Sequence, residues 1–227
     1  MVEKTYLISG DQERCYLEFD KKVFEEATVK KIFLINLTSR DEDIVARKKG
    51  HLETYFLNIG YEKVVFASDF TSTDDIRSKI NSFGVLFVCG GDTDVLFDEV
   101  NRRELADVIK DFGGIVVANS AGAYLLSREY VRTKDLEFAE GLSFVDIACK
   151  AHFVPELEEE LREKSRQKEF FAISDGSVIV VENDNLNTIG NVYLFKDGER
   201  RNCARMKFFI GQAVSGMDIE GLREVDL

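Results

Sequence analysis

The chain contains 227 residues, and its 44% apolar content is enough to build the core of one large domain. Its formal net charge of −12 argues against nucleic acid and anionic membranes as partners, because both require a basic face on the protein. No apolar run approaches the roughly 20 residues of a membrane span, and the N-terminus lacks the apolar segment of a signal peptide. We therefore expect a cytoplasmic protein with a single domain over residues 1–227, as a monomer or a homodimer.

In chain order, short β-rich runs alternate with amphipathic helical patterns through the first half of the sequence. The expected strands cover residues 5–9, 31–37, 63–67, 84–88 and 115–118. The expected helices cover residues 15–26, 43–58, 73–82 and 93–111. Strict alternation of this kind predicts an α/β fold with a largely parallel central sheet and helices on both of its faces.

After Phe144 the pattern changes. A charged amphipathic segment over residues 156–170 precedes two short β-rich runs, at 178–181 and 192–195, and the Asp197-Gly198 pair after them is typical of a hairpin turn. We therefore expect antiparallel strands near the C-terminus. No Gly/Ser-rich linker divides the chain.

The four cysteines are widely scattered, and none forms a CxxC pair or lies beside a histidine: Cys15, Cys89, Cys149 and Cys203. Structural zinc sites need ligand pairs two to four residues apart. We expect reduced thiols, no metal and no cofactor.

Two expected strands deliver chemically useful residues to one edge of the sheet, since ligands of open parallel sheets bind beyond the carboxyl ends of the strands. The strand at 84–88 is followed by CGGDT, and the strand at 115–118 is followed by NSAG, which contains Ser120. A serine on a tight strand-to-helix turn fits the G-x-S-x-G nucleophile pattern, with Ala118 in place of the first glycine. The alternative is that Ser120 only caps the following helix.

The glycine pair offers a partner for a serine nucleophile. The N–H of Ala121, at the start of the expected helix, and an N–H from Gly90 or Gly91 could together face a developing oxyanion. The alternative is that the Gly-Gly pair after the strand forms only an ordinary turn.

A serine nucleophile needs a base, and the sequence contains two histidines. His51 lies among charged residues of an expected helix, whereas His152 lies at the end of a β-rich run, which makes His152 the candidate base. The carboxylate that would orient it is either Asp135 or Asp175. Either aspartate could instead serve only a turn.

These residues resemble the family of peptidase E (aspartyl dipeptidase) and cyanophycinase, serine peptidases on a class I glutamine-amidotransferase-like fold. The NSAGA segment with Ser120 resembles the family's nucleophile turn, and VCGGDTDVLF is similar to its GGGNT loop, with Cys89 and Asp92 in place of the usual glycine and asparagine. The AHF segment resembles the family's PHF, with Ala151 in place of proline, and matches His152 to the catalytic histidine.

The resemblance implies a serine-type peptidase that hydrolyses short peptides, notably dipeptides with an aspartyl residue, through an acyl-enzyme. The VRTKD segment matches Asp135 to one proposed triad aspartate, and ISDGS matches Asp175 to a family glutamate in the same role; we favour Asp175. The SRQKE segment matches Arg166 to an arginine that recognises the aspartyl side chain, and Asp92 would add a negative charge near the pocket. Arg166 could equally pair with a neighbouring glutamate on an exposed helix.

Two alternatives stay open at this point. A catalytically inactive family member acting as a binding or regulatory module is suggested by the departures from the family pattern: Cys89, Asp92, Ala118, Ala151 and Asp175. An esterase of the α/β-hydrolase fold is less favoured, because the chain is short for that fold and its histidine comes early.

Overall fold

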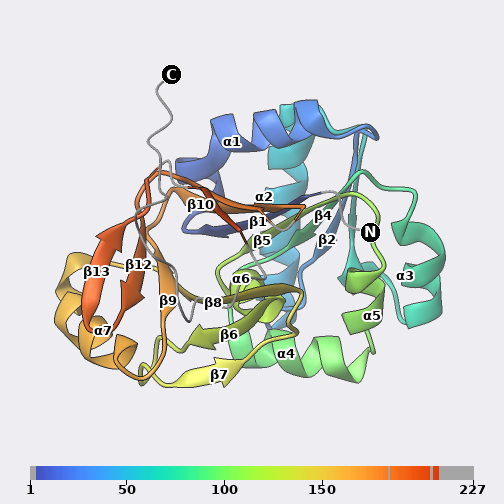
Figure 1. Ribbon diagram of the computed structural model, residues 1–227. Coiled ribbons are helices and arrows are strands. Elements are labelled where there is room, and N and C mark those ends of the chain that lie inside the picture. Colours follow the sequence, from blue (N-terminus) through green and yellow to red (C-terminus); the bar gives the residue numbers. More distant parts are fainter. Residues whose placement is uncertain (1–3, 184, 205–206, 210–227) are drawn as a thin grey trace.

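The computed structural model of the chain describes residues 4–183, 185–204 and 207–209. Within these ranges the strands form two sheets (Figure 1). The larger sheet has the order β14 (Lys207–Phe209), β11 (Asn185–Ile189), β10 (Ser177–Glu182), β1 (Lys4–Ser9), β5 (Ile115–Asn119), β4 (Val85–Val88), β2 (Lys31–Ile35) and β3 (Lys63–Phe66). The smaller sheet has the order β13 (Glu199–Asn202), β12 (Val192–Lys196), β9 (Phe170–Ile173), β8 (Val145–Ala151), β6 (Ser127–Val131) and β7 (Phe138–Glu140).

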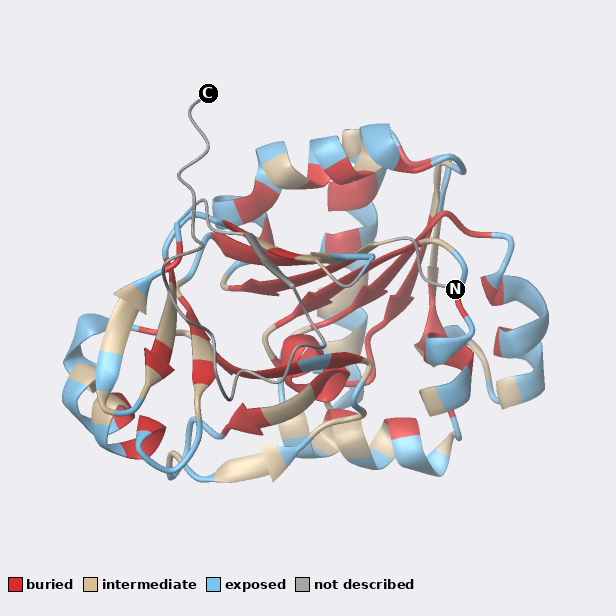
Figure 2. Ribbon diagram, in the orientation of Figure 1, coloured by how far each residue is buried: buried red, intermediate tan, exposed pale blue. Residues whose placement is uncertain are grey.

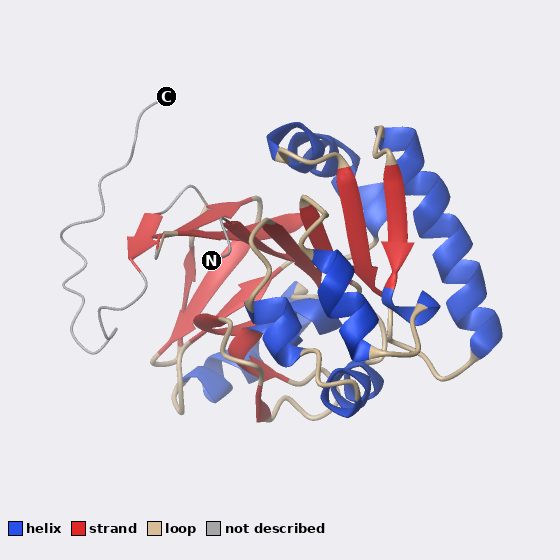
Figure 3. Cartoon of the chain, turned by 90° about the vertical axis from the view of Figure 1, so that its right-hand side faces the viewer, coloured by secondary structure: helices blue, strands red, loops and turns tan. Residues whose placement is uncertain are grey.

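Helices cover both faces of the larger sheet (Figure 3). One face packs against α1 (Gln12–Glu26) and α2 (Glu42–Ile59), through a core that includes Tyr16, Phe56 and Phe87. The other face packs against α3 (Thr73–Ile80), α4 (Thr93–Arg102), α5 (Ala106–Lys110) and α6 (Ala121–Leu126). None of the helices in the described ranges is long and apolar enough to cross a membrane.

The short helix α6 lies between the two sheets, and all six of its residues are buried. One apolar cluster contains residues of β5, of α6 and of β8, so the core is continuous from one sheet to the other. The outer face of the smaller sheet is covered by α7 (Glu158–Ser165), which contributes Leu161 to a third cluster with Phe170 and Phe195.

The five strands β1, β5, β4, β2 and β3 pair in parallel. Parallel strands covered on both faces are uniformly apolar, and β4 and β5 are buried along their whole length (Figure 2). On the other side, β10 pairs antiparallel with β1 and is followed by β11 and β14. The predicted fold class, a largely parallel sheet between helices with antiparallel strands near the C-terminus, is confirmed.

The structure differs from the sequence prediction in two places. The helix expected over residues 93–111 is two helices, because the chain leaves helical geometry at Glu104, whose φ is 50°. The later strands do not simply extend the first sheet, since β9, β12 and β13 belong to the smaller sheet. The predicted hairpin is present: β12 and β13 pair antiparallel across Asp197 and Gly198, both with positive φ. A single domain over residues 1–227 stays a prediction, since its range extends beyond the described residues.

The backbone contact at Gly84 leads to a stability prediction. A Cβ atom on Gly84 would lie 2.1 Å from the carbonyl oxygen of Val29, so Gly84→Ala must displace backbone. We expect a loss of about 2 kcal/mol in the free energy of unfolding, measured by urea denaturation. Gly50→Ala is the matched control: a Cβ there meets no atom within 4 Å, on the exposed side of α2. It should add about 0.5–1 kcal/mol through helix propensity. Equal effects of the two changes would contradict this account.

Candidate active site

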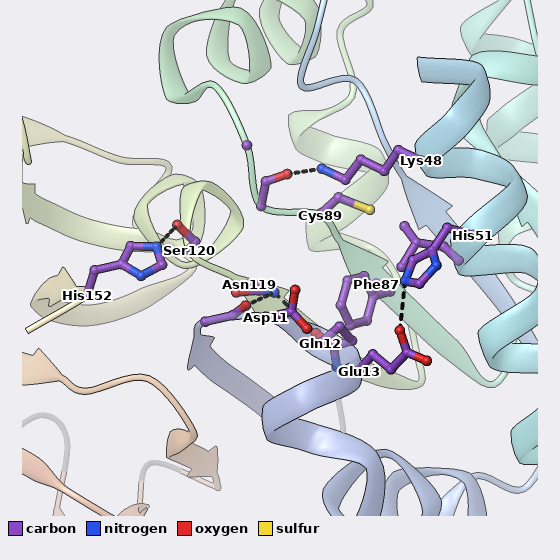
Figure 4. Close-up of a pocket in the computed structure, with 14 residues that line it drawn as sticks. Asp11, Gln12, Glu13, Lys48, His51, Phe87, Cys89, Asn119, Ser120 and His152 are labelled. Atoms are coloured by element: carbon purple, nitrogen blue, oxygen red, sulfur yellow. Dashed lines mark hydrogen bonds and ion pairs between the residues drawn. The ribbon is translucent and has the colours of Figure 1, made fainter. Parts of the chain in front are cut away.

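A cavity of about 280 Å³ opens at the carboxyl edge of the larger sheet. Its wall is formed by residues that directly follow three neighbouring strands: Gly10 after β1, Gly90 and Gly91 after β4, and Ser120 after β5. Figure 4 shows Ser120 and His152 on one side of the cavity and Lys48 and His51, from α2, on the other.

Ser120 lies on the turn between β5 and α6, in a conformation that only the surrounding structure can hold. Its φ and ψ are 51° and −104°, and its N–H donates to the carbonyl of Ile8 (2.9 Å). Its side chain makes no capping hydrogen bond to α6, which removes the helix-cap alternative. Close packing explains the glycine two residues later, since a Cβ on Gly122 would lie 2.4 Å from the carbonyl oxygen of Val88. The turn has the geometry of a nucleophile elbow.

His152 follows β8 and joins Ser120 to Asp175. Its Nε2 lies 2.7 Å from the Ser120 Oγ, and its Nδ1 lies 2.8 Å from the Asp175 Oδ1. Since an ionised carboxylate only accepts hydrogen bonds, Nδ1 carries the proton, and Nε2 is left to accept the hydroxyl proton of Ser120. The side chains of His152 and Asp175 are 41% and 53% exposed, so a ligand can reach them.

Ser9, at the end of β1, holds His152 and Asp175 in place through its hydroxyl. It was not among the residues predicted from the sequence. Its fully buried hydroxyl donates to the Asp175 Oδ1 (2.9 Å) and accepts the backbone N–H of His152 (2.7 Å). The backbone of His152 has a φ of 57°, and the Ser9 contact holds its N–H in place. The signal that could have identified Ser9 is its position at the carboxyl end of an expected strand, where ligands of a parallel sheet bind.

Asp175 lies in the turn between β9 and β10, pressed against the end of β1. A Cβ on Gly10 would lie 2.9 Å from the Cβ of Asp175, and the N–H of Gly176 donates to the Ser9 carbonyl (3.0 Å). Glycine at position 10, where φ is 119°, is therefore required for the Asp175 carboxylate to approach His152.

The structure places the other candidate aspartate elsewhere. Asp135 is exposed and accepts from Arg132 Nε (3.0 Å), Arg132 Nη2 (2.7 Å) and the N–H of Glu137 (3.0 Å). The Glu137 N–H and the Arg132 guanidinium hold the pKa of this carboxyl below its usual range. Both carboxylate oxygens are engaged in this local turn, away from His152.

The predicted oxyanion donors adjoin Ser120. A Cβ on Gly90 would lie 3.2 Å from the Ser120 Cβ, so the glycine loop is in contact with the serine turn. Gly91 has a φ of 140°, which favours glycine. Among the described residues, the N–H groups of Gly91 and Ala121 donate to no other protein atom. Gly91 lines the cavity, whereas Ala121 is fully buried as the first residue of α6, where an N–H has no partner within the helix.

Two predicted substrate-binding residues are not among those that line the cavity. Arg166 ends α7, where its exposed guanidinium pairs with Glu163. Asp92 caps α4, accepting the N–H of Val95 at 3.0 Å. Each side chain has a local structural partner, and their substrate-binding roles stay predictions without support from this placement.

A buried polar chain leads from the serine turn to an acidic residue. Asn119 donates through Nδ2 to the Gly10 carbonyl (3.0 Å) and to Gln12 Oε1 (3.2 Å), and Gln12 donates to Asp20 Oδ2 (2.6 Å). The hydroxyl of Tyr55 donates to the same Asp20 oxygen (2.6 Å). Burial raises the pKa of the Asp20 carboxyl to about 7, against the opposing hydrogen bonds of Tyr55 and Gln12. Asp20 therefore titrates near neutral pH.

A second buried polar side chain, Lys150, lies beside the site. It is fully buried, and its Nζ donates to the carbonyl of Ala151 (2.6 Å) and to Thr133 Oγ1 (3.1 Å). Burial lowers the pKa of its ammonium to about 8. Because the contacted carbonyl belongs to the peptide that leads into His152, Lys150 helps to fix the end of β8.

The remaining cavity wall carries charge of both signs and one thiol. His51, which lies among charged residues of α2 as expected, is at the cavity, with its Nε2 3.5 Å from Glu13 Oε2. Burial raises the pKa of the Cys89 thiol to about 11. All four cysteines are free. In the part of the chain that the structure describes, no cluster of His, Cys, Asp and Glu side chains could hold a metal ion.

The Asp20 network leads to a prediction on pH-dependent stability. The folded pKa of about 7 lies above the ordinary value of 3.8, so between these pH values the folded state binds more protons than the unfolded state. The free energy of unfolding must then fall as pH rises through this window. Asp20→Asn, whose side-chain oxygen can accept both hydrogen bonds, should remove the loss. In urea denaturation, the free energy of unfolding of the variant relative to that of the wild type should rise by on the order of 2 kcal/mol between pH 5 and pH 8. A difference in the free energy of unfolding between the two proteins that does not change with pH would contradict this role of Asp20.

Comparisons with known proteins identify the family and the fold of the chain. The model of peptidase family S51 matches residues 8–189. No curated protein sequence matches the chain. Among solved structures, a peptidase from an acI-B1 Actinobacterium is similar with a TM-score of 0.68 and 16% identity, covering 93% of this chain and 96% of that one. A peptidase E protein of Listeria monocytogenes EGD-e, described as putative, is similar with a TM-score of 0.60 and 18% identity, covering 82% of this chain and 98% of that one. The structural likeness shows a shared fold, and the family match over most of the chain shows that it belongs to peptidase family S51.

Proposed function

We propose that this chain is a serine peptidase that cleaves short peptides through an acyl-enzyme formed on Ser120. The observation that carries the proposal is the continuous hydrogen-bonded chain from Ser120 through His152 to Asp175, built on a backbone turn that presents the serine at the cavity. A structural serine has no need of a positive φ and a histidine partner. Family membership supplies the reaction class, and this hydrogen-bonded chain supplies the residues.

In the proposed reaction, the Ser120 Oγ attacks the scissile carbonyl carbon while His152 Nε2 takes the hydroxyl proton. His152 returns this proton to the amine nitrogen as the C–N bond breaks, which leaves the acyl group on Ser120. Water then attacks the ester carbonyl, giving a proton to His152, and the Oγ leaves with that proton. Asp175 keeps the proton of neutral His152 on Nδ1 and stabilises the imidazolium that forms in each step.

The oxyanion of each tetrahedral intermediate is proposed to lie between the N–H groups of Gly91 and Ala121. Donors that are already oriented toward the developing charge contribute about 3 kcal/mol each to transition-state stabilisation. The contact of the glycine loop with the Ser120 side chain supports this arrangement, with Gly90 supplying the close approach.

The proposed substrates are dipeptides and other short peptides with an aspartyl residue. A cavity of about 280 Å³ admits a small peptide rather than a folded chain. The aspartyl preference is based on the sequence resemblance to peptidase E, because Arg166 lies outside the residues that line the cavity. Within the cavity wall, Lys48 provides positive charge.

The nucleophile can be tested with a fluorophosphonate probe that forms a covalent bond to activated serines. We expect stoichiometric labelling of the wild-type protein at Ser120 and none of Ser120→Ala, with intact far-UV circular dichroism. His152→Ala should lose labelling as well, because the hydroxyl proton then has no acceptor. An unlabelled, folded wild-type protein would instead support the inactive, binding-module alternative.

The choice of carboxylate can be tested by comparing Asp175→Asn with Asp135→Asn. In Asp175→Asn the amide can donate to Nδ1 and favour the wrong tautomer, so kcat for Asp-Leu should fall on the order of 10³-fold to 10⁴-fold. Asp135→Asn changes only an exposed turn and should stay within about twofold of the wild type. The reverse result would assign the role to Asp135.

The aspartyl preference can be tested with Ala-Leu as the comparison substrate for Asp-Leu. Equal kcat/KM values of the wild-type protein for the two dipeptides would overturn the aspartyl preference.

A further inference from the structure

Lys48 makes a contact in the cavity that the proposed reaction has not used. It extends from α2 along the cavity wall, and its Nζ donates to the carbonyl oxygen of Gly90 (Figure 4). The same Nζ donates to Thr38 Oγ1 (3.1 Å). A lysine on the surface of a helix would ordinarily extend into water. Here the side chain is half-buried and its ammonium is directed onto a backbone carbonyl.

The loop that Lys48 contacts is held tightly on several sides. A Cβ on Gly91 would lie 2.6 Å from Thr38 Oγ1, the N–H of Asp92 donates to the Thr38 carbonyl (3.2 Å), and the N–H of Cys89 donates to the Ile35 carbonyl (3.0 Å). Gly90 itself is in contact with Ser120. The peptide between Gly90 and Gly91 is thus fixed between Lys48 and the serine turn.

The geometry of this peptide relates Lys48 to the reacting centre. The described residues contain no cis peptide bond, and in a planar trans peptide the C=O and the N–H point in opposite directions. The carbonyl of Gly90 faces the ammonium of Lys48, so the N–H of Gly91, in the same peptide, points away from Lys48. This N–H is one of the two proposed oxyanion donors.

We propose that Lys48 is a positioning residue that orients and polarises the Gly90–Gly91 peptide, so that the Gly91 N–H binds the oxyanion more strongly. A charge-assisted hydrogen bond to the carbonyl oxygen draws electron density from the amide nitrogen, and hydrogen bonds linked through one peptide strengthen each other. The ammonium also places a positive charge on the far side of this peptide from the oxyanion. This inference rests on the proposed function, since it requires the oxyanion formed by attack of Ser120.

A different role for Lys48 is direct binding of a substrate carboxylate. Of the three N–H groups of the ammonium, two are used by Gly90 and Thr38. The two roles differ in what they change. Polarisation of the Gly91 N–H acts on the transition state, so its loss lowers the rate constant of the chemical step. A contact with a substrate carboxylate acts on binding of the ground state as well.

The kinetic test uses the rate of reaction with an uncharged fluorophosphonate probe, whose phosphoryl oxygen would occupy the oxyanion position. Losing a whole oxyanion donor costs about 10²-fold to 10³-fold, so weakening one by Lys48→Met should lower the maximal labelling rate about tenfold, with the probe's half-saturation concentration within about twofold. Lys48→Arg, which restores the charge and the donors, should recover most of this rate. If Lys48→Met raises the half-saturation concentration of the probe tenfold at an unchanged maximal rate, or changes neither quantity, the inference is overturned.

The matched control is Lys49→Met, which removes a charge from the neighbouring position of the same helix. Lys49 pairs with Asp69 and lies over the ring of Phe66, outside the residues that line the cavity. Its labelling rate should equal that of the wild type. A loss in Lys49→Met as large as that in Lys48→Met would show a general effect of charge and would overturn the inference.

A spectroscopic test separates this inference from the proposed function. The amide ¹⁵N resonance of Gly91 reports the hydrogen bond at the carbonyl of its own peptide, without any reaction. We expect it to move upfield in Lys48→Met, to return in Lys48→Arg and to stay unchanged in Lys49→Met. If the wild-type protein does not react with the fluorophosphonate but its Gly91 resonance shows this pattern, the proposed function is refuted and the polarised peptide is not. If the wild-type protein reacts with the fluorophosphonate but the Gly91 resonance does not move in Lys48→Met, the polarisation alone is refuted. Should Lys48→Met fail to fold, Lys48→Gln, which keeps a donor without charge, is expected to show an intermediate shift.

Discussion

The backbone at Ser120 is the constraint on which the rest of the site depends. A non-glycine residue with φ of 51° and ψ of −104° is strained by on the order of 1–3 kcal/mol. The sheet supplies the restraint, because β5 lies between β1 and β4. On one side the Ser120 N–H donates to Ile8 of β1, and on the other side Gly122 allows α6 to contact Val88 of β4. Both restraints require the parallel order of these three strands, so the hydroxyl is exposed at the cavity as a consequence of the topology.

The second sheet provides the two residues that the proposed reaction needs beside Ser120, namely the proposed base His152 and the carboxylate Asp175. His152 follows β8 and Asp175 follows β9, and these two parallel strands end side by side. Ser9 connects them to the larger sheet, since its hydroxyl contacts both residues and its carbonyl accepts the N–H of Gly176. The relative position of the two sheets therefore determines the distance between Ser120 and His152. Buried α6 fixes that position, because it packs against both sheets in one apolar cluster.

The first half of the chain could be predicted from sequence because each of its elements has a clear period and its strands alternate strictly with helices. The position of Ser120 followed from the change of a buried strand into a helix, and His152 followed from having one competitor. The pairing of the later strands could not be predicted, because their short apolar runs fit either sheet. Ser9 was missed, since only motifs, and not single residues, were selected at the strand ends. The role of Arg166 stays a prediction, because a matching motif does not fix which way a helix end faces. Asp135 and Asp175 both lie in turns of the sequence, and the structure separates them, because the Nδ1 of His152 lies 2.8 Å from Asp175 Oδ1 while Asp135 pairs with Arg132.

The charge of the chain raises the question of how an acidic protein stabilises an oxyanion. A net charge of −12 produces an unfavourable field over the whole surface, and α6, with six residues, is too short for a substantial helix dipole. Stabilisation must then come from groups close to the reacting atoms, where the low dielectric of a partly buried site strengthens them. The proposed donors, the N–H groups of Ala121 and Gly91, would meet this requirement, and in our proposal the ammonium of Lys48 strengthens the Gly91 N–H through the carbonyl of Gly90. Because the ammonium of Lys48 is bound to the Gly90 carbonyl in the cavity wall, the proposed site gains positive potential without an ion pair that would occupy the position of the substrate.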